Sequence, residues 1–175
     1  MSTNPPVDGL NSEDSKGFLE DLRRETDRGA AVVGGAWLDE QLRQLLAKRL
    51  IDKPDEVEEL LGSLETGSYA PLGSFAARIT AAYCMGLITE PMRNDLKTIA
   101  KIRNRFAHRL PGLTFDSAIV KDFCNTLVTL GELPAELPKI YRARDQFMCT
   151  VALLMQRIGM NTLQAEHTHE RRGLW

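Results

Sequence analysis

The chain has 175 residues, of which 43% are hydrophobic and 26% are charged. This length accommodates one domain with a substantial core and leaves little room for a second. The formal net charge of −2 excludes a general cationic field that would hold the protein on duplex DNA, so any contact with nucleic acid must be local.

The cysteines and the hydropathy pattern indicate the cellular setting. Cys84, Cys124 and Cys149 lie far apart in apolar periodic segments, which predicts reduced thiols in the core. No basic start with an apolar stretch opens the chain, and no apolar run approaches the roughly 18 residues of a membrane span. We therefore expect a cytoplasmic protein without a membrane segment.

The first helical patterns follow a polar lead-in, residues 1–14, which we expect to carry no chemistry. A short apolar stripe is followed by a longer one that reaches Ile51. Together they predict two helices, or one helix bent near Gly29 or at the pair Gly34 and Gly35.

Turn and capping residues set the next three helices. Proline and acidic residues at the start, and a glycine at the end, predict a short helix over 55–61. The segment "SFAARITAAYC" predicts a second helix that stops at Gly86. Thr89 can cap a third helix, which has Glu90 and Pro91 in its first turn and extends to Ala107.

The last part of the chain predicts two more helices. Asp116 or Ser117 can cap one that continues to about Leu130, and a long segment over 139–163 has apolar residues at helical spacing. A polar tail, residues 164–175, follows. Since no alternating strand pattern and no repeat is visible, the prediction is an all-α, single-domain bundle of six or seven helices over 15–163.

Arg103 is out of place in this pattern. At about 100° per residue it falls in the middle of the apolar side of its helix, whereas Lys97, Lys101 and Arg105 fall on the opposite side. A guanidinium cannot lose its charge, so this position is costly unless it meets a carboxylate, a phosphate or carbonyls, or reaches water. Arg103 is therefore a candidate functional residue.

His108 follows Arg103 by five residues. We expect the helix to end before it, so that the imidazole can turn back beside Arg103, with Asn104 at the edge between them. The string Arg103-Asn104-x-x-x-His108 resembles the Arg-x4-6-His motif of the HEPN superfamily, whose members are compact helical bundles that usually dimerise. That resemblance implies metal-independent RNA cleavage, with His108 as general acid and base, Arg103 stabilising the transition state and Asn104 orienting one of them.

A longer stretch resembles the mannitol operon repressor family. The run "YAPLGSFAARITAAYCMGLITEPMRNDLKTIAKIRNRFAH" carries the Pro-Leu-Gly, the Arg-Ile, the Tyr-x-x-Gly-Leu-Ile block and the Arg-x4-His of that family, and the similarity covers about 28–130. It implies a helical, HEPN-like homodimer that regulates transcription without an obvious DNA-reading module. Asn104 and Arg105 are more cationic than the acidic filler of the repressor itself, and are closer to the nuclease pattern.

Structural interpretations stand beside these functional ones. A histidine near a helix C-terminus interacts with the helix dipole, and Arg103 can pair with carboxylates or carbonyls of a neighbouring helix. Arg78 can add charge to the same cleft, but an ion pair with the acidic helix around 55–59 is the favoured interpretation. The basic residues Lys97, Lys101, Arg105 and Arg109 indicate a solvated face, which becomes a phosphate track only if it borders Arg103 and His108.

Other candidate sites are weaker. His167 and His169 beside Glu166 lack a third fixed ligand, so neither a metal nor a cofactor is expected. Trp37 fits a core position or a dimer surface better than a base-stacking platform. The break "GLITEP" could imitate a helix-turn-helix, but the basic residues of the following helix are not gathered at its N-terminal end, so direct sequence-specific DNA binding is not expected.

Two functions remain from the sequence. The first is a cytoplasmic, mannitol-repressor-like regulator, a negative regulator of gene expression that acts as a homodimer through a protein partner or a local nucleic-acid contact. The alternative is a metal-independent endoribonuclease with Arg103, His108 and Asn104 at its site, and with Arg78, Lys101, Arg105 and Arg109 contacting RNA. The sequence does not decide whether the protein is an enzyme.

Overall fold

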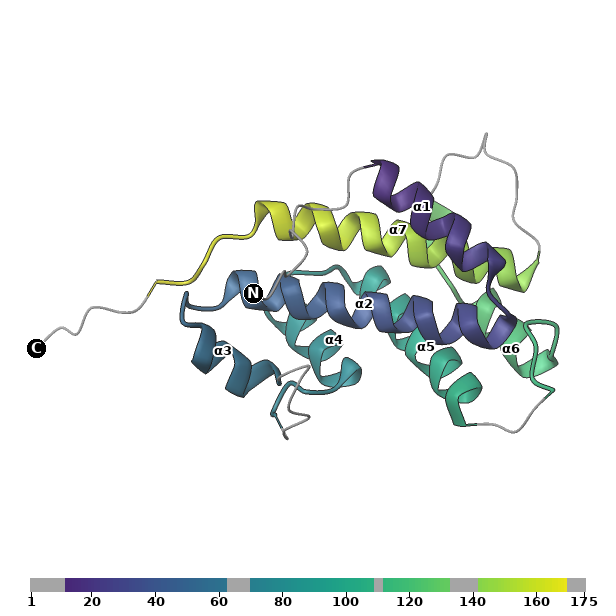
Figure 1. Cartoon of the computed structure of the whole chain (residues 1–175), viewed down its shortest axis with the longest axis horizontal. Helices are drawn as coiled ribbons and strands as arrows, with labels where there is room; N and C mark the ends of the chain where they lie inside the picture. The colour runs from purple at the N-terminus through teal and green to yellow at the C-terminus, as the bar shows by residue number, and fades with distance from the viewer. Residues whose placement is uncertain (1–11, 63–69, 109–111, 133–141, 170–175) are drawn as a thin grey trace, which may run out of the picture.

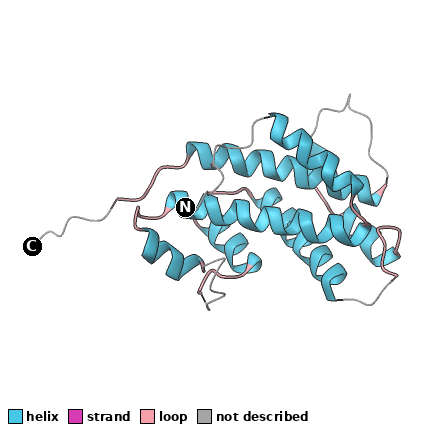
Figure 2. Cartoon of the chain, viewed as in Figure 1, coloured by secondary structure: helices cyan, strands magenta, loops and turns pink. Residues whose placement is uncertain are grey.

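The computed structural model describes residues 12–62, 70–108, 112–132 and 142–169. Within these ranges every regular element is helical and no strand occurs (Figure 2). The elements, in chain order, are α1 (Ser12–Arg24), α2 (Asp27–Arg49), α3 (Pro54–Leu61), α4 (Phe75–Cys84), α5 (Glu90–His108), α6 (Ala118–Asn125), the 3-10 turn η1 (Thr129–Glu132) and α7 (Ala143–Gln164). The predicted all-α helical bundle is confirmed.

Helix α2 is the centre of the arrangement (Figure 1). It packs against α7 on one side and against α4 and α5 on the other, while α1 lies across α7 and α2. Leucines of α2 are fully buried at Leu38, Leu42, Leu45 and Leu46, and meet apolar residues of the surrounding helices in one cluster. Because α2 is enclosed on several sides, it has buried residues along most of its length, from Ala30 to Leu46.

The boundary between the first two helices lies at Glu25 and Thr26. Thr26 is extended and its hydroxyl accepts the backbone N–H of Gly29 at 3.0 Å, which satisfies one of the free donors at the start of α2. Gly29, Gly34 and Gly35 all lie inside α2. The two-helix prediction is confirmed, and the alternative of one helix bent at these glycines is wrong.

Most other helix ends agree with the sequence. Gly62 and Gly86 have φ of 85° and 69° after α3 and α4, a left-handed backbone that favours glycine. Thr89 accepts the N–H of Met92 at 3.5 Å at the start of α5. The predicted start of the last helix, residues 139–141, lies outside the described residues, and the helix begins at Ala143.

The predicted continuation of the sixth helix to Leu130 is wrong, because α6 ends at Asn125 and η1 follows. The cause is Asp95 of α5, which is fully buried. Its carboxylate accepts the backbone N–H groups of Val128 at 2.9 Å and Thr129 at 2.7 Å. These two bonds hold the chain in a turn where periodicity alone would continue a helix.

The three cysteines differ in burial. Cys124 is buried and Cys149 is half-buried, and burial raises the pKa of both thiols, to about 12 for Cys124. Cys84 is exposed at the end of α4, so its prediction as a core thiol is wrong. A helix's last residue can face solvent even when the helix is amphipathic.

The beginning of the predicted polar tail is fixed to the bundle. After α7, residues 165–169 run beside the C-terminal end of α2. Thr168 donates its backbone N–H and its hydroxyl to the carbonyl of Arg49, at 3.2 and 2.8 Å. Arg49 in turn donates to the carbonyl of Glu166 at 3.0 Å. Residues 170–175 lie outside the described part of the chain.

In the part of the chain that the structure describes, no helix has the length and apolar character needed to cross a membrane.

Candidate functional site

Helix α5 carries most of the predicted site residues. Its buried side is formed by Met92, Asp95, Leu96, Ile99, Ile102 and Phe106. At its C-terminal end, Arg28 of α2 donates Nε to the carbonyl of Phe106 at 2.7 Å. This contact satisfies a carbonyl that the helix leaves free, and fixes the end of α5 against α2.

Arg103 lies at the crossing of α5 and α2, where its aliphatic stem covers Gly35. A Cβ built on Gly35 would lie 2.8 Å from Cδ of Arg103 and 3.0 Å from its Cβ and Cγ. The side chain is half-buried, as its position on the apolar side of the helix predicts. Among the described residues, no hydrogen bond or ion pair to the Arg103 guanidinium is found.

Asp39 of α2 is a charged group that interacts with Arg103, and the sequence interpretation missed it. Its carboxylate forms an ion pair with Arg78 of α4 at 2.6 Å, and the positive charge of Arg103 also acts on it. Burial raises the pKa of Asp39 above its ordinary value of 3.8, and the two arginines oppose that rise. Helices α2, α4 and α5 thus bring together one carboxylate and two guanidiniums.

Arg78 takes the central position in this cluster. Its side chain is only 8% exposed, and besides the ion pair it donates to the carbonyl of Leu61, at the end of α3, at 2.9 Å. The predicted ion pair with the acidic helix around 55–59 is wrong. The acidic side chains of α3 face solvent, whereas Asp39 projects toward α4 from the side of α2 that packs against it.

The structure does not bring Arg103 and His108 onto one side of the helix. Contrary to expectation, α5 includes His108, so at about 100° per residue the two side chains leave the helix about 140° apart. His108 is exposed, and so is Asn104. Within one chain, α5 does not bring the side chains of Arg103 and His108 together. A catalytic role for Arg103, Asn104 and His108 stays a prediction.

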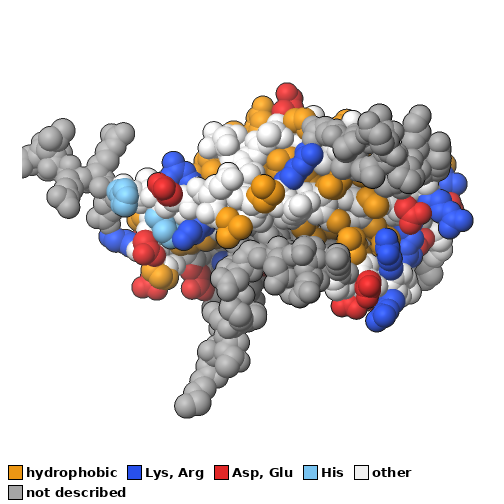
Figure 3. All heavy atoms as spheres, turned by 90° about the horizontal axis from the view of Figure 1, so that it is seen from above, with side chains coloured by type: hydrophobic (Ala, Val, Ile, Leu, Met, Phe, Trp, Pro, Cys, Tyr) orange, Lys and Arg blue, Asp and Glu red, His pale blue; other side chains and the backbone are white. Residues whose placement is uncertain are grey.

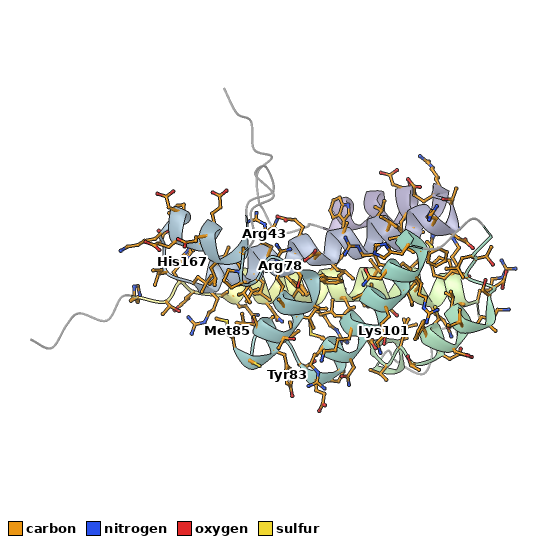
Figure 4. All side chains as sticks on the ribbon, turned by 90° about the horizontal axis from the view of Figure 1, so that it is seen from below. Arg43, Arg78, Tyr83, Met85, Lys101 and His167 are labelled. Atoms are coloured by element: carbon orange, nitrogen blue, oxygen red, sulfur yellow. The ribbon has the colours of Figure 1, made fainter. Side chains whose placement is uncertain are left out.

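The residues predicted to contact nucleic acid lie in different environments. Lys101 is exposed and lies away from Arg78 (Figure 4). Arg105 is half-buried, with its guanidinium 5.9 Å from the ring centre of Phe123 on α6, a cation–π arrangement. Arg109 lies outside the described residues. A phosphate track made of these residues stays a prediction.

Two other candidates are placed by the structure. The ring of His167 contacts the carbonyl of Leu50 through Nδ1 at 2.9 Å, so it supports the packing of the C-terminal segment on α2. The described ranges contain no group of three or more metal-ligating side chains. Trp37 is 41% exposed, so its interpretation as a core residue is wrong and the dimer surface stays a prediction.

Comparisons with known proteins identify the fold. No protein-family model matches the chain, and no curated protein matches it. Among solved structures, MtlR in the MtlR-HPr complex from Escherichia coli aligns with a TM-score of 0.65 and 18% identity, over 83% of this chain and 98% of MtlR. The chain has the MtlR fold. YggD from Shigella flexneri, described as a possible transcriptional regulator, aligns with a TM-score of 0.61 and 13% identity, over 87% of this chain and 98% of YggD.

Proposed function

We propose that this protein is a regulator of the mannitol-repressor-like family, that it acts on gene expression through a protein partner, and that its effect is negative. The observation that carries the proposal is the shared fold, which covers nearly the whole of MtlR and of YggD. MtlR was solved in a complex with HPr, so this fold can present a surface to another protein. At the low identity of both matches, the partner and the sign of regulation rest on analogy.

The geometry of α5 supports regulation without direct reading of DNA. A recognition helix offers the side chains of its first turns to the major groove. Here Met92 is buried in the first turn of α5, and Arg93 bonds to Glu90 at 3.0 Å and lies 4.3 Å from the ring centre of Tyr83. The basic side chain at this end of the helix is therefore engaged within the protein.

A homodimer is part of the proposal. Hydrophobic side chains lie across the middle of the face in Figure 3, while many of the charged ones lie toward its ends. Trp37 on α2 and Met160 and Leu163 on α7 are 41%, 53% and 71% exposed. A second copy that covers such side chains would remove apolar surface from water.

The test combines binding and expression. Purified protein is titrated with HPr by isothermal calorimetry, its mass is measured by light scattering, and transcripts are compared between a deletion strain and its complemented parent. The expected results are a complex with HPr, a dimer, and transcripts that rise on deletion. A monomer that binds no HPr, in a strain whose transcripts do not change, would refute the proposal.

A metal-independent endoribonuclease is the second candidate, favoured by the half-buried guanidinium of Arg103 and by the exposed imidazole of His108. Since the side chains of Arg103 and His108 leave α5 in different directions, His108 would have to meet the Arg103 of another subunit. Single-stranded RNA is incubated with excess EDTA. The candidate predicts 2′,3′-cyclic phosphate ends from the wild type and from Arg93→Ala, and none from Arg103→Ala or His108→Ala. Equal cleavage by all four proteins would eliminate it.

A further inference from the structure

Two of the carboxylates on α2 are paired with arginines. Arg43 pairs with Glu40 at 3.0 Å, and Arg78 pairs with Asp39 at 2.6 Å. Figure 4 places Arg43 and Arg78 on the same side of the bundle. Arg103 has no ion-pair partner of its own among the described residues, so its permanent positive charge is not matched by a hydrogen-bonded carboxylate.

Asp39 attracts Arg103 through space but accepts no hydrogen bond from it. One face of its carboxylate is occupied by the short bond from Arg78. Its burial also disfavours the charged form, as the raised pKa of Asp39 indicates. The half-buried Arg103 side chain has no hydrogen-bond acceptor among the described residues, and an added oxyanion would supply one.

Several of the side chains around Arg103 are small and uncharged. On α5, Ala100 and Ala107 precede and follow it by three and four residues, which places them on its side of the helix. Ala107 is exposed and Ala100 is half-buried. On α2, Gly35 lies beneath the arginine stem, and Ala36 beside it is exposed. An approaching group therefore meets the Arg103 side chain among small apolar residues of both helices.

This arrangement fits a protein carboxylate better than a nucleic acid. A nucleic-acid backbone is held by several phosphate contacts at once, and each requires a cation that is not already neutralised. Among the described residues here, Arg43 and Arg78 are already paired with Glu40 and Asp39, and Arg28 bonds to a backbone carbonyl of α5, so a nucleic-acid backbone would find few cations to contact. A single Glu or Asp side chain, flanked by apolar residues of its own protein, matches both the charge and the surroundings.

We propose that the seam between α2 and α5 is a docking surface for a protein partner, and that Arg103 binds one carboxylate of that partner through its two-pronged guanidinium. The inference rests on the proposed function, because it assumes regulation through a protein. It adds the residue and the chemistry of recognition. Because the carboxylate of Asp39 bonds to Arg78, it does not take up the hydrogen-bond donors of Arg103, and these can bind the partner's carboxylate.

The first experiment observes Arg103 directly. In ¹⁵N-labelled protein, the Nε–H signal of Arg103 is assigned by its loss in Arg103→Gln, which keeps the Cβ, Cγ and Cδ atoms that cover Gly35. The probes are N-acetyl-glutamate amide and a short single-stranded RNA, each at matched ionic strength with chloride as the reference. The carboxylate is expected to shift the Arg103 signal more than that of Arg93, which is already paired with Glu90. No shift with the carboxylate, or a larger response to RNA, would overturn the inference.

The second experiment uses HPr as the partner probe. Arg103→Gln is expected to weaken binding by about 10-fold or more, since a charge-assisted hydrogen bond is lost, and Arg103→Lys by less. Arg93→Gln on the same helix removes an equal charge and is expected to stay within about twofold. Unchanged binding by Arg103→Gln would overturn the inference and leave the proposed function intact. If the wild type binds no HPr, that partner is wrong, and the titration with the glutamate amide alone decides the role of Arg103.

Discussion

Replacing Gly35 by alanine tests the contact between α2 and α5 that places Arg103. The new Cβ would lie 2.8 Å from Cδ of Arg103 and 3.0 Å from its Cβ and Cγ. Carbon atoms prefer separations of about 3.5–4.0 Å. The Cβ of Arg103 is fixed to the backbone of α5, so rotation of the side chain cannot relieve the whole clash. The two helices must move apart.

Two opposing effects determine how much Gly35→Ala changes the free energy of unfolding. Alanine inside a helix is favoured over glycine by about 0.5–1 kcal/mol. Forcing an extra carbon into a packed contact costs about 1–3 kcal/mol. The second effect wins, and we expect Gly35→Ala to lower the free energy of unfolding by about 1 kcal/mol, which corresponds to a fall in Tm of about 2–4 °C for a chain of this size.

Thermal and urea unfolding, followed by circular dichroism, measure this change. Gly159→Ala in α7 is the matched control, because a Cβ there meets no atom within 4 Å. It should therefore show only the helix preference and raise stability by about 0.5–1 kcal/mol. In a background of Arg103→Ala the cost of Gly35→Ala should shrink. If Gly35→Ala stabilises the protein as much as Gly159→Ala does, the packing of Arg103 on Gly35 is not as described.

Two further predictions concern buried carboxylates. Asp95→Ala leaves the backbone N–H groups of Val128 and Thr129 without acceptors and should lower the free energy of unfolding by about 3 kcal/mol. Hydrogen exchange should accelerate first at these two amides. Unchanged exchange there would contradict the role of Asp95. The pKa of Asp39 is raised above its ordinary value of 3.8, so the folded protein binds the proton of this carboxyl more tightly than the unfolded chain does. The contribution of Asp39 to the free energy of unfolding therefore falls as the pH rises from about 3.8 through the folded-state pKa. Carboxyl NMR should place the Asp39 midpoint above 3.8, and Arg78→Gln should raise it further; a lower midpoint in that variant would show that Arg78 does not stabilise the charged carboxylate.

The helices and the unusual position of Arg103 could be predicted from the sequence because they depend on neighbours within one or two turns. Caps such as Thr26, and glycines such as Gly62 and Gly86, act on the backbone beside them. In the same way, the apolar side of α5 is defined by its own spacing, and Arg103 falls within that side whatever packs against it. The end of α6 could not be predicted, because it depends on Asp95, more than 30 residues earlier.

The candidate site itself was decided by the tertiary structure. A sequence records that Arg78 and Arg103 carry charge, but not which carboxylate each one meets, because that depends on how α2 crosses α4 and α5. The crossing selected Asp39 for Arg78, where local charge favoured the acidic residues of α3. It also set Gly35 beneath Arg103. The continuation of α5 through His108 turned that side chain away from the arginine. Short-range preferences determined the helices of this protein, and the long-range packing of those helices determined which charges are paired.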